Sequence, residues 1–246
     1  SILIAAIFRP NHIYFKWYGR FMRKSLHKFS HIFVQDSSSL ALVKDSGYAQ
    51  VSVAGDTRFD RVSRLSKHTE ALPKEIQGIL TAFSAEKPLF VGGSVWPEDM
   101  SILGMAFEKT THNIKFVLAP HKVDKASLET LLQALPIQLQ KQSVWLSKTN
   151  PQEASKASLL IVDRIGILNQ IYPLAQMAYV GGGFKTGLHN TLEAAVYGIP
   201  LAIGPNFNKF KEAKDLVALG GIQVINTTEN ATQFLELVVE KPYIEQ

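Results

Sequence analysis

The chain has 246 residues, of which 46% are hydrophobic and 19% charged, a composition typical of a globular protein with one large core or two small ones. It contains no cysteine, which excludes disulfide bonds, thiolate metal sites and a cysteine nucleophile. The net charge of +5 favours anionic partners. Because this charge is modest, phosphate-bearing small molecules and acidic membranes are as compatible with it as nucleic acid is.

The first 30 residues predict a strand followed by a basic helix. Residues 1–8 are apolar and predict a buried strand, which Arg-Pro-Asn at 9–11 ends. Helical periodicity then runs to about Ser30, with Trp17, Phe21 and Leu26 near one side. The other side carries Lys16, Arg20, Arg23, Lys24 and His27. No acidic residue precedes Asp36, so this amphipathic helix is either a solvated face or a contact with a membrane.

Two more strands complete the end of a first α/β domain, which we assign to residues 1–56. The strands are predicted at 31–36 and 51–56, and the serines at 37–39 supply the N-cap of a short helix between them. Because the chain starts without Met inside an apolar strand, we expect a further portion upstream. No apolar run reaches the roughly 18 residues that span a bilayer, so we expect neither a transmembrane helix nor a signal peptide in this sequence.

A second domain is predicted at 88–246, after a polar connection at 57–87. Apolar runs alternate there with helical stretches, which predicts a parallel sheet wrapped by helices, a Rossmann-like domain. The runs lie at 88–93, 114–120, 143–147, 158–163, 177–182, 200–205 and 221–225. Ligands of such sheets bind beyond the carboxyl ends of the strands. Three loops of that rim are therefore candidates for ligand contact, and they hold Gly92, Gly93, Ser94, Pro120, His121, Lys122 and the residues 163–166.

A fourth loop carries the strongest signal. Three glycines at 181–183 follow a strand and precede a helix expected to begin at about Asn190, where free N–H groups and the helix dipole favour a phosphate. His189 and Asn190 would flank that phosphate, and Glu193 would accept hydrogen bonds from a ribose diol. A neighbouring loop could add Asn206, Asn208 and Lys209.

Each of these residues also has a purely structural interpretation. The glycines could serve only a tight turn, and Glu193 could be an acid in the first turn of a helix. His121 could simply neighbour an N-cap, and Trp96 and Phe184 could be packing residues. The histidines lack the His-Glu-x-x-His spacing of metal sites, so we expect no metal.

Five segments together resemble the transferases of 3-deoxy-D-manno-octulosonic acid (Kdo) in lipopolysaccharide synthesis, in the form seen in Bacteroidetes-like bacteria. They are FRPNHIYFKWYG, VAGDTRFDRV, FVGGSVWPED, FVLAPHKVD and the long stretch 163–210. The most specific piece is GGGFKTGLHNTLEAAVYGIP at 181–200, with GPNFNKF close behind it.

The resemblance implies a GT-B glycosyltransferase with two facing Rossmann-like domains, of which this chain holds the end of the first and the whole second. The implied donor is CMP-Kdo and the implied acceptor is a lipid A precursor (lipid IVA) at the cytoplasmic face of the inner membrane. No cofactor or metal is implied. The implied donor-binding residues are Ser94, Pro120, His121, Lys122, Gly166, Gly182, Gly183, His189, Asn190 and Glu193. Arg9 would lie on the acceptor side, and the catalytic base would lie upstream of residue 1.

The chain departs from the family beside Pro120, where His121 and Lys122 follow directly and many relatives carry an arginine. A lysine meets a phosphate as a point charge and lacks the bidentate fork of arginine. Two alternatives stay open: another GT-B transferase or an epimerase that uses a UDP-sugar, and a non-catalytic nucleotide-binding or membrane-docking module. We expect no nucleic-acid partner under any of these interpretations.

Overall fold

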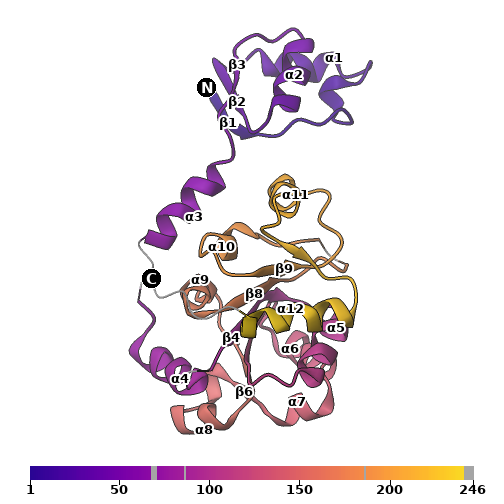
Figure 1. Cartoon of the computed structure of the whole chain (residues 1–246). Coiled ribbons are helices and arrows are strands. Elements are labelled where there is room, and N and C mark those ends of the chain that lie inside the picture. The colour runs from indigo at the N-terminus through magenta and orange to yellow at the C-terminus, as the bar shows by residue number, and fades with distance from the viewer. Residues whose placement is uncertain (68–70, 86, 186, 241–246) are drawn as a thin grey trace. The chain divides into compact units, whose positions relative to one another are not determined.

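The computed structural model describes residues 1–67, 71–85, 87–185 and 187–240, and the chain divides into two units, Ser1–Arg64 and Leu65–Gln246 (Figure 1). Both units are α/β, as the sequence predicts. The division falls inside the segment 57–87 that we assigned to a connection. That segment forms two helices, α3 (Thr57–Lys67) and α4 (Lys74–Ser84).

The first unit is built on a three-stranded parallel sheet in the order β1-β2-β3. Its strands are β1 (Ile2–Ala6), β2 (His31–Val34) and β3 (Val51–Val53). The 3₁₀ helix η1 (Ile13–Phe15), α1 (Arg20–Leu26) and α2 (Ser37–Asp45) connect them. Leu3, Ile32 and Val51 are aligned across the strands and pack into a small core with Phe8 and Leu26.

Three details of this unit differ from the sequence-based prediction. The basic helix is only α1, because Gly19 lies so close to the Ile13 carbonyl that no side chain fits there, and residues 11–19 form turns around η1. The N-cap of α2 is Asp36, whose carboxylate accepts from the Ser39 amide. β1 is not a buried strand, because Ile2 and Ile4 are 61% and 63% exposed.

The second unit contains a seven-stranded sheet in the order β10-β9-β8-β4-β5-β7-β6, with every neighbouring pair parallel. All seven predicted strands are confirmed; six are shorter than predicted, whereas β4 extends to Val95, past the predicted end at residue 93. They are β4 (Leu89–Val95), β5 (Lys115–Pro120), β6 (Ser143–Trp145), β7 (Leu159–Ile161), β8 (Met177–Val180), β9 (Leu201–Ile203) and β10 (Gln223–Val224).

Helices cover both faces of this sheet (Figure 1). One face packs against α5 (Pro97–Lys109), α6 (Lys125–Gln133), α7 (Ile137–Lys141) and α12 (Thr228–Glu240). The other packs against α4, α8 (Pro151–Lys156), α9 (Leu168–Ile171), α10 (Leu192–Ala195) and α11 (Lys211–Ala218). The 3₁₀ helices η2 (Leu146–Lys148) and η3 (Tyr172–Leu174) complete the connections. α4 therefore belongs to the core of this unit, through the buried Ile76, Ile79, Leu80 and Phe83.

None of the helices in the described part of the chain is long and apolar enough to cross a membrane.

Candidate functional site

The chain changes direction across the large sheet between β4 and β8. These strands are neighbours, with Gly93 aligned with Val180, but β4 leads into α5 on one face and β8 leads toward α10 on the other. Such a point leaves a crevice at the carboxyl ends of the two strands, where α/β sheets bind their ligands. The loops after β4, β5 and β8 meet there.

An aromatic stack occupies this edge of the sheet. Trp96 follows β4, His121 follows β5, and His189 lies in the loop after β8. The ring of His121 stacks on Trp96 and on His189, with ring centroids 4.5 Å and 4.3 Å apart. The indole Nε1 of Trp96 donates a hydrogen bond to Nε2 of His189 at 3.0 Å. The stack thus joins three loops that are far apart in sequence.

The surroundings of the stack disfavour positive charge on both histidines. Burial lowers the pKa of His189, and the neighbouring His121 lowers it further. Burial also lowers the pKa of His121, to which the ammonium of Lys122 adds. Lys122 itself lies over the indole of Trp96, with Nζ 5.7 Å from the ring centroid. Near neutral pH the fixed charge beside the stack is therefore the lysine.

The first turn of α5 holds the glycine loop, residues 181–189, in place. Asp99 is fully buried, and its carboxylate accepts from the amide of Gly182 at 3.2 Å. Glu98 forms an ion pair with Lys185 of the loop at 2.8 Å. Together with the bond from Trp96 to His189, these contacts attach the loop to one short segment, residues 96–99.

Each of the three glycines at 181–183 has a packing reason. A side chain on Gly181 would collide with the carbonyl of Ser94, and one on Gly182 would collide with the carbonyl of Gly187. A Cβ on Gly183 would lie 2.7 Å from Cα of Gly204. The amides of Gly181 and Gly182 donate to the Gly93 carbonyl and to the Asp99 carboxylate, and the space that the glycines leave is filled by the protein's own backbone.

The helix after this loop is short and begins close to the predicted start. α10 begins at Leu192, just after the predicted start at about Asn190, and has four residues, so its dipole is weak. Asn190 instead supports the turn, since its Oδ1 accepts from the Leu192 amide at 3.2 Å. Its Nδ2 donates to Glu193 at 2.9 Å, which fixes the carboxylate beside the loop.

Ser94 and Pro120 lie on the same rim as the stack. Ser94 adopts a left-handed backbone conformation with φ of 51°, an uncommon state for a residue other than glycine, and it interrupts the register between β4 and β5. Such strain is concentrated at functional sites. Pro120 ends β5 and lines a pocket of about 220 Å³ with Trp96, His121 and Lys122.

The remaining predicted residues do not take part in the stack. Gly166, after β7, is exposed and has nothing within 4 Å of its Cβ position. Asn206 serves the glycine loop, because its side chain donates to the Phe184 carbonyl at 3.0 Å. Asn208 and Lys209 are exposed, and Arg9 belongs to the first unit. Within the described ranges, no three His, Asp or Glu side chains are grouped so that they could hold a metal.

Sequence reasoning missed two residues that build this site. The sequence is compatible with Trp96 as a packing residue, yet its side chain contacts both histidines. Asp99 does not follow from the glycine motif, although it connects Gly182, Tyr179 and the Trp96 amide. The signal was present in Trp-Pro-Glu-Asp at 96–99, because an acidic residue three positions after a strand end commonly caps the next helix.

Several curated proteins are similar to the sequence, and no family model matches it. A 3-deoxy-D-manno-octulosonic acid transferase of Aquifex aeolicus is 32% identical over 160 residues, which cover 63% of this chain and 43% of the relative. The enzyme of the same name from Chlamydophila psittaci is 29% identical over 158 residues, 63% of this chain and 35% of the relative. That of Rickettsia bellii is 24% identical over 226 residues, 89% of this chain and 51% of the relative.

Solved structures share the fold. The C-terminal CMP-Kdo binding domain of WaaA from Acinetobacter baumannii matches with a TM-score of 0.51 and 17% identity, over 67% of this chain and 89% of that domain. A trehalose-phosphate synthase from Burkholderia xenovorans matches with a TM-score of 0.53 and 14% identity, over 91% of this chain and 56% of that protein. The fold is that of the GT-B glycosyltransferases. The chain is similar to 3-deoxy-D-manno-octulosonic acid transferases and spans about half the length, or less, of these three curated relatives.

Proposed function

We propose that this chain forms the donor-binding part of a glycosyltransferase that moves Kdo from CMP-Kdo to a lipid A precursor. The observation that carries the proposal is the stack of Trp96, His121 and His189 at the switch point of the sheet. It gathers hydrogen-bonding rings and the ammonium of Lys122 where α/β sheets bind nucleotides. The similarity to Kdo transferases supports Kdo as the donor sugar.

The residues of the site divide naturally between the parts of a cytidine monophosphate. Lys122 and the N–H of His189 suit the phosphate, which accepts hydrogen bonds and carries negative charge. Glu193 suits the ribose diol, because Asn190 holds one of its oxygens and a carboxylate has acceptor sites left for two hydroxyls. Asp99 holds the glycine loop in place, and this loop carries His189 and leads to Glu193. The groups suited to the phosphate and to the ribose therefore lie on one stretch of chain.

The proposed reaction is an inverting displacement. A general base removes the proton of the acceptor hydroxyl, whose oxygen forms a bond to the anomeric carbon of Kdo. The bond from that carbon to the phosphate oxygen breaks, and its electron pair leaves with CMP. Lys122 and the N–H groups of the site stabilise the charge on the departing phosphate. The reaction requires no cofactor or metal.

Calorimetric titration of the chain with CMP, UMP and UDP tests the donor assignment. We expect CMP to bind best, and Glu193→Gln to weaken it about tenfold, as expected for hydrogen bonds to a charged group. The matched variant Glu236→Gln, on an exposed position of α12, should bind CMP like the wild type. Binding of UDP without CMP would favour the UDP-sugar alternative, and a chain that binds no nucleotide would contradict a donor site here.

The acceptor and the location are also proposals. We propose that the first unit contacts the cytoplasmic face of the inner membrane, where a lipid A precursor would be presented. The support is an interfacial patch made of Ile13, Trp17, Tyr18 and Phe21. Trp17 is 90% exposed and Phe21 is 84% exposed, although both are large apolar side chains.

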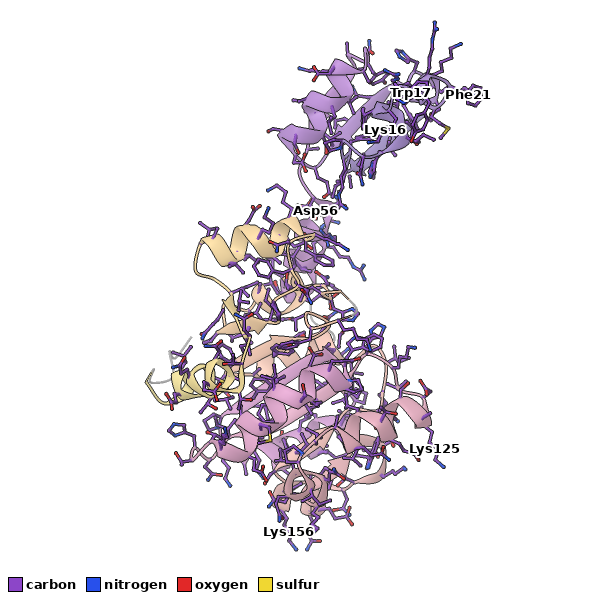
Figure 2. All side chains as sticks on the ribbon, turned by 90° about the vertical axis from the view of Figure 1, so that its right-hand side faces the viewer. Lys16, Trp17, Phe21, Asp56, Lys125 and Lys156 are labelled. Carbon is purple, nitrogen blue, oxygen red and sulfur yellow. The ribbon has the colours of Figure 1, made fainter. Side chains whose placement is uncertain are left out.

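Basic residues surround the interfacial patch. Lys16, Trp17 and Phe21 lie at the same end of the first unit (Figure 2), and Arg20 and Lys24 are exposed on α1. Arg23 differs from the prediction, since it is half-buried and donates to the Lys16 carbonyl at 3.4 Å. Exposed aromatic side chains among cations are suited to the interface of an anionic bilayer, where each cation contributes about 1 kcal/mol of attraction.

A further inference from the structure

The hydrogen bond between Trp96 and His189 constrains where the histidine carries its proton. An indole N–H can only donate, so Nε2 of His189 must be the acceptor. The two rings are nearly parallel, with 8° between their planes, and the two nitrogens are 3.0 Å apart. Because a neutral imidazole has one protonated and one unprotonated nitrogen, the proton of His189 has to be on Nδ1.

We infer that Trp96 is a positioning residue, which holds His189 as the Nδ1–H tautomer so that this N–H is the one presented to the phosphate of the donor. The identity of the ligand rests on the proposed function, whereas the tautomer is a property of the protein without ligand. Among the residues that the structure describes, none forms a hydrogen bond with Nδ1 of His189. The half-buried ring therefore has one donor left for a ligand.

The same hydrogen bond opposes protonation of His189. An imidazolium would place a second N–H at Nε2, directly opposite the indole N–H, so the bond to Trp96 would have to break. His121 stacks on the ring at 4.3 Å, and two stacked imidazolium ions would repel each other. The other titratable groups on the elements around His189 include Lys122 after β5, Tyr179 on β8, Glu98 and Asp99 on α5, Lys185 in the glycine loop and Glu193 on α10.

This arrangement limits what His189 can do in the reaction. A neutral imidazole that gave up its Nδ1 proton would become an imidazolate, which is far too basic to form near neutral pH. His189 therefore acts as a fixed hydrogen-bond donor to the leaving phosphate and not as a proton-transfer group. A donor oriented before the reaction stabilises developing charge without reorganisation.

Long-range ¹⁵N NMR of the histidine rings tests the inference directly on the free chain. We expect His189 to show a pyrrole-type Nδ1 and a pyridine-type Nε2 in the wild type. Trp96→Phe keeps an aromatic ring but removes the indole N–H. In that variant we expect the Nε2–H form to become populated and the pKa of His189 to rise toward its ordinary value. Trp145→Phe is the matched control, because it removes an indole from β6, away from the stack.

A pyrrole-type Nε2 on His189 in the wild type would overturn the inference, and so would a Trp96→Phe spectrum and titration identical to the wild type. The wild-type spectrum decides the tautomer even if the variant fails to fold. A titration with CMP separates the two proposals. Trp96→Phe should weaken CMP about tenfold near neutral pH, whereas a wild type with the Nδ1–H tautomer that ignores CMP would refute the proposed function alone.

Discussion

Asp99 accepts a hydrogen bond from the hydroxyl of Tyr179 at 2.7 Å, entirely within the interior of the second unit. The other carboxylate oxygen accepts from the amides of Trp96 at 2.8 Å and Gly182 at 3.2 Å. One buried side chain thus fastens the strand β8, the glycine loop and the start of α5 to each other. The candidate site is therefore held in shape by the fold itself, before any ligand binds.

Replacing Asp99 with asparagine should destabilise the second unit and loosen the glycine loop. The new amide group would turn a donor toward N–H and O–H groups that need an acceptor, which costs about 2–3 kcal/mol for a buried network. Urea unfolding measures the loss. Glu108→Gln, on an exposed position of the same helix, is the matched control and should leave the free energy of unfolding almost unchanged. Equal stability of Asp99→Asn and the control would show that these hydrogen bonds contribute little.

Two glycine-to-alanine substitutions should differ in how much stability they remove, because only one of the added methyl groups collides with the backbone. Gly183→Ala places a methyl group 2.7 Å from the Gly204 backbone, so two loops must move apart, with an expected loss of about 3 kcal/mol. The added methyl group of Gly198→Ala has nothing within 4 Å, so the only cost is the positive φ of 66°, which should lower the free energy of unfolding by about 1–2 kcal/mol. Thermal unfolding of both variants checks the order. A more stable Gly183→Ala would mean that the loops separate easily.

The stability of the chain should fall as the pH drops below about 6.5, because of the two stacked histidines. Their pKa values are lowered in the folded state by burial, so between the folded value and the ordinary value of 6.5 the unfolded chain binds more protons. Their contribution is present above pH 6.5 and is lost as the pH falls through the folded pKa. The contribution of Asp99 to stability changes with pH in the opposite direction, because burial raises the pKa of its carboxyl group above 3.8. Its contribution is complete below that value and is lost as the pH rises.

Urea midpoints measured from about pH 7.5 downward check this dependence. In the double variant His121→Asn/His189→Asn the urea midpoint should depend less on pH than in the wild type. Asp99 is present in both proteins, so its contribution cancels in the comparison. Parallel profiles would contradict the assignment to these histidines.

The larger sheet could be predicted from the sequence because its strands are short apolar runs bounded by Gly, Pro or Asp, as in LAIGP at 201–205. The basic helix was predicted too long because the same spacing of aromatic and basic residues continues through Gly19, where backbone contact with Ile13 forces a turn. The spacing of aromatic and basic residues shows which side of a helix each residue faces, but it does not show where the helix begins.

The core of the site could not be predicted in the same way. Trp96 and His189 are 93 residues apart, and they meet only because β4 and β8 become neighbours in the sheet. His189 and Glu193 could be recognised as polar residues after a strand, but their partners depend on strand order. A single sequence does not reveal that order before the connections are known.

The interfacial patch should bind anionic vesicles. We expect the chain to sediment with phosphatidylglycerol-containing vesicles more than with phosphatidylcholine vesicles, and added salt should release it because screening weakens the attraction of Arg20 and Lys24. The double variant Trp17→Ala/Phe21→Ala should lose most of this binding. Leu219→Ala removes an equally exposed apolar side chain from the second unit and serves as control. Equal binding of the two variants would argue against membrane contact through α1.

The donor site is tested most directly by the indole N–H signals of the chain in a ¹H–¹⁵N spectrum. The sequence has three tryptophans, so the spectrum should show three such signals, of which that of Trp96 reports on the hydrogen bond to His189. Added CMP should shift the Trp96 signal at concentrations where UDP does not, and should leave those of Trp17 and Trp145 in place. An unmoved Trp96 signal at saturating CMP, or shifts confined to the other two, would contradict a CMP site at the carboxyl ends of β4 and β8.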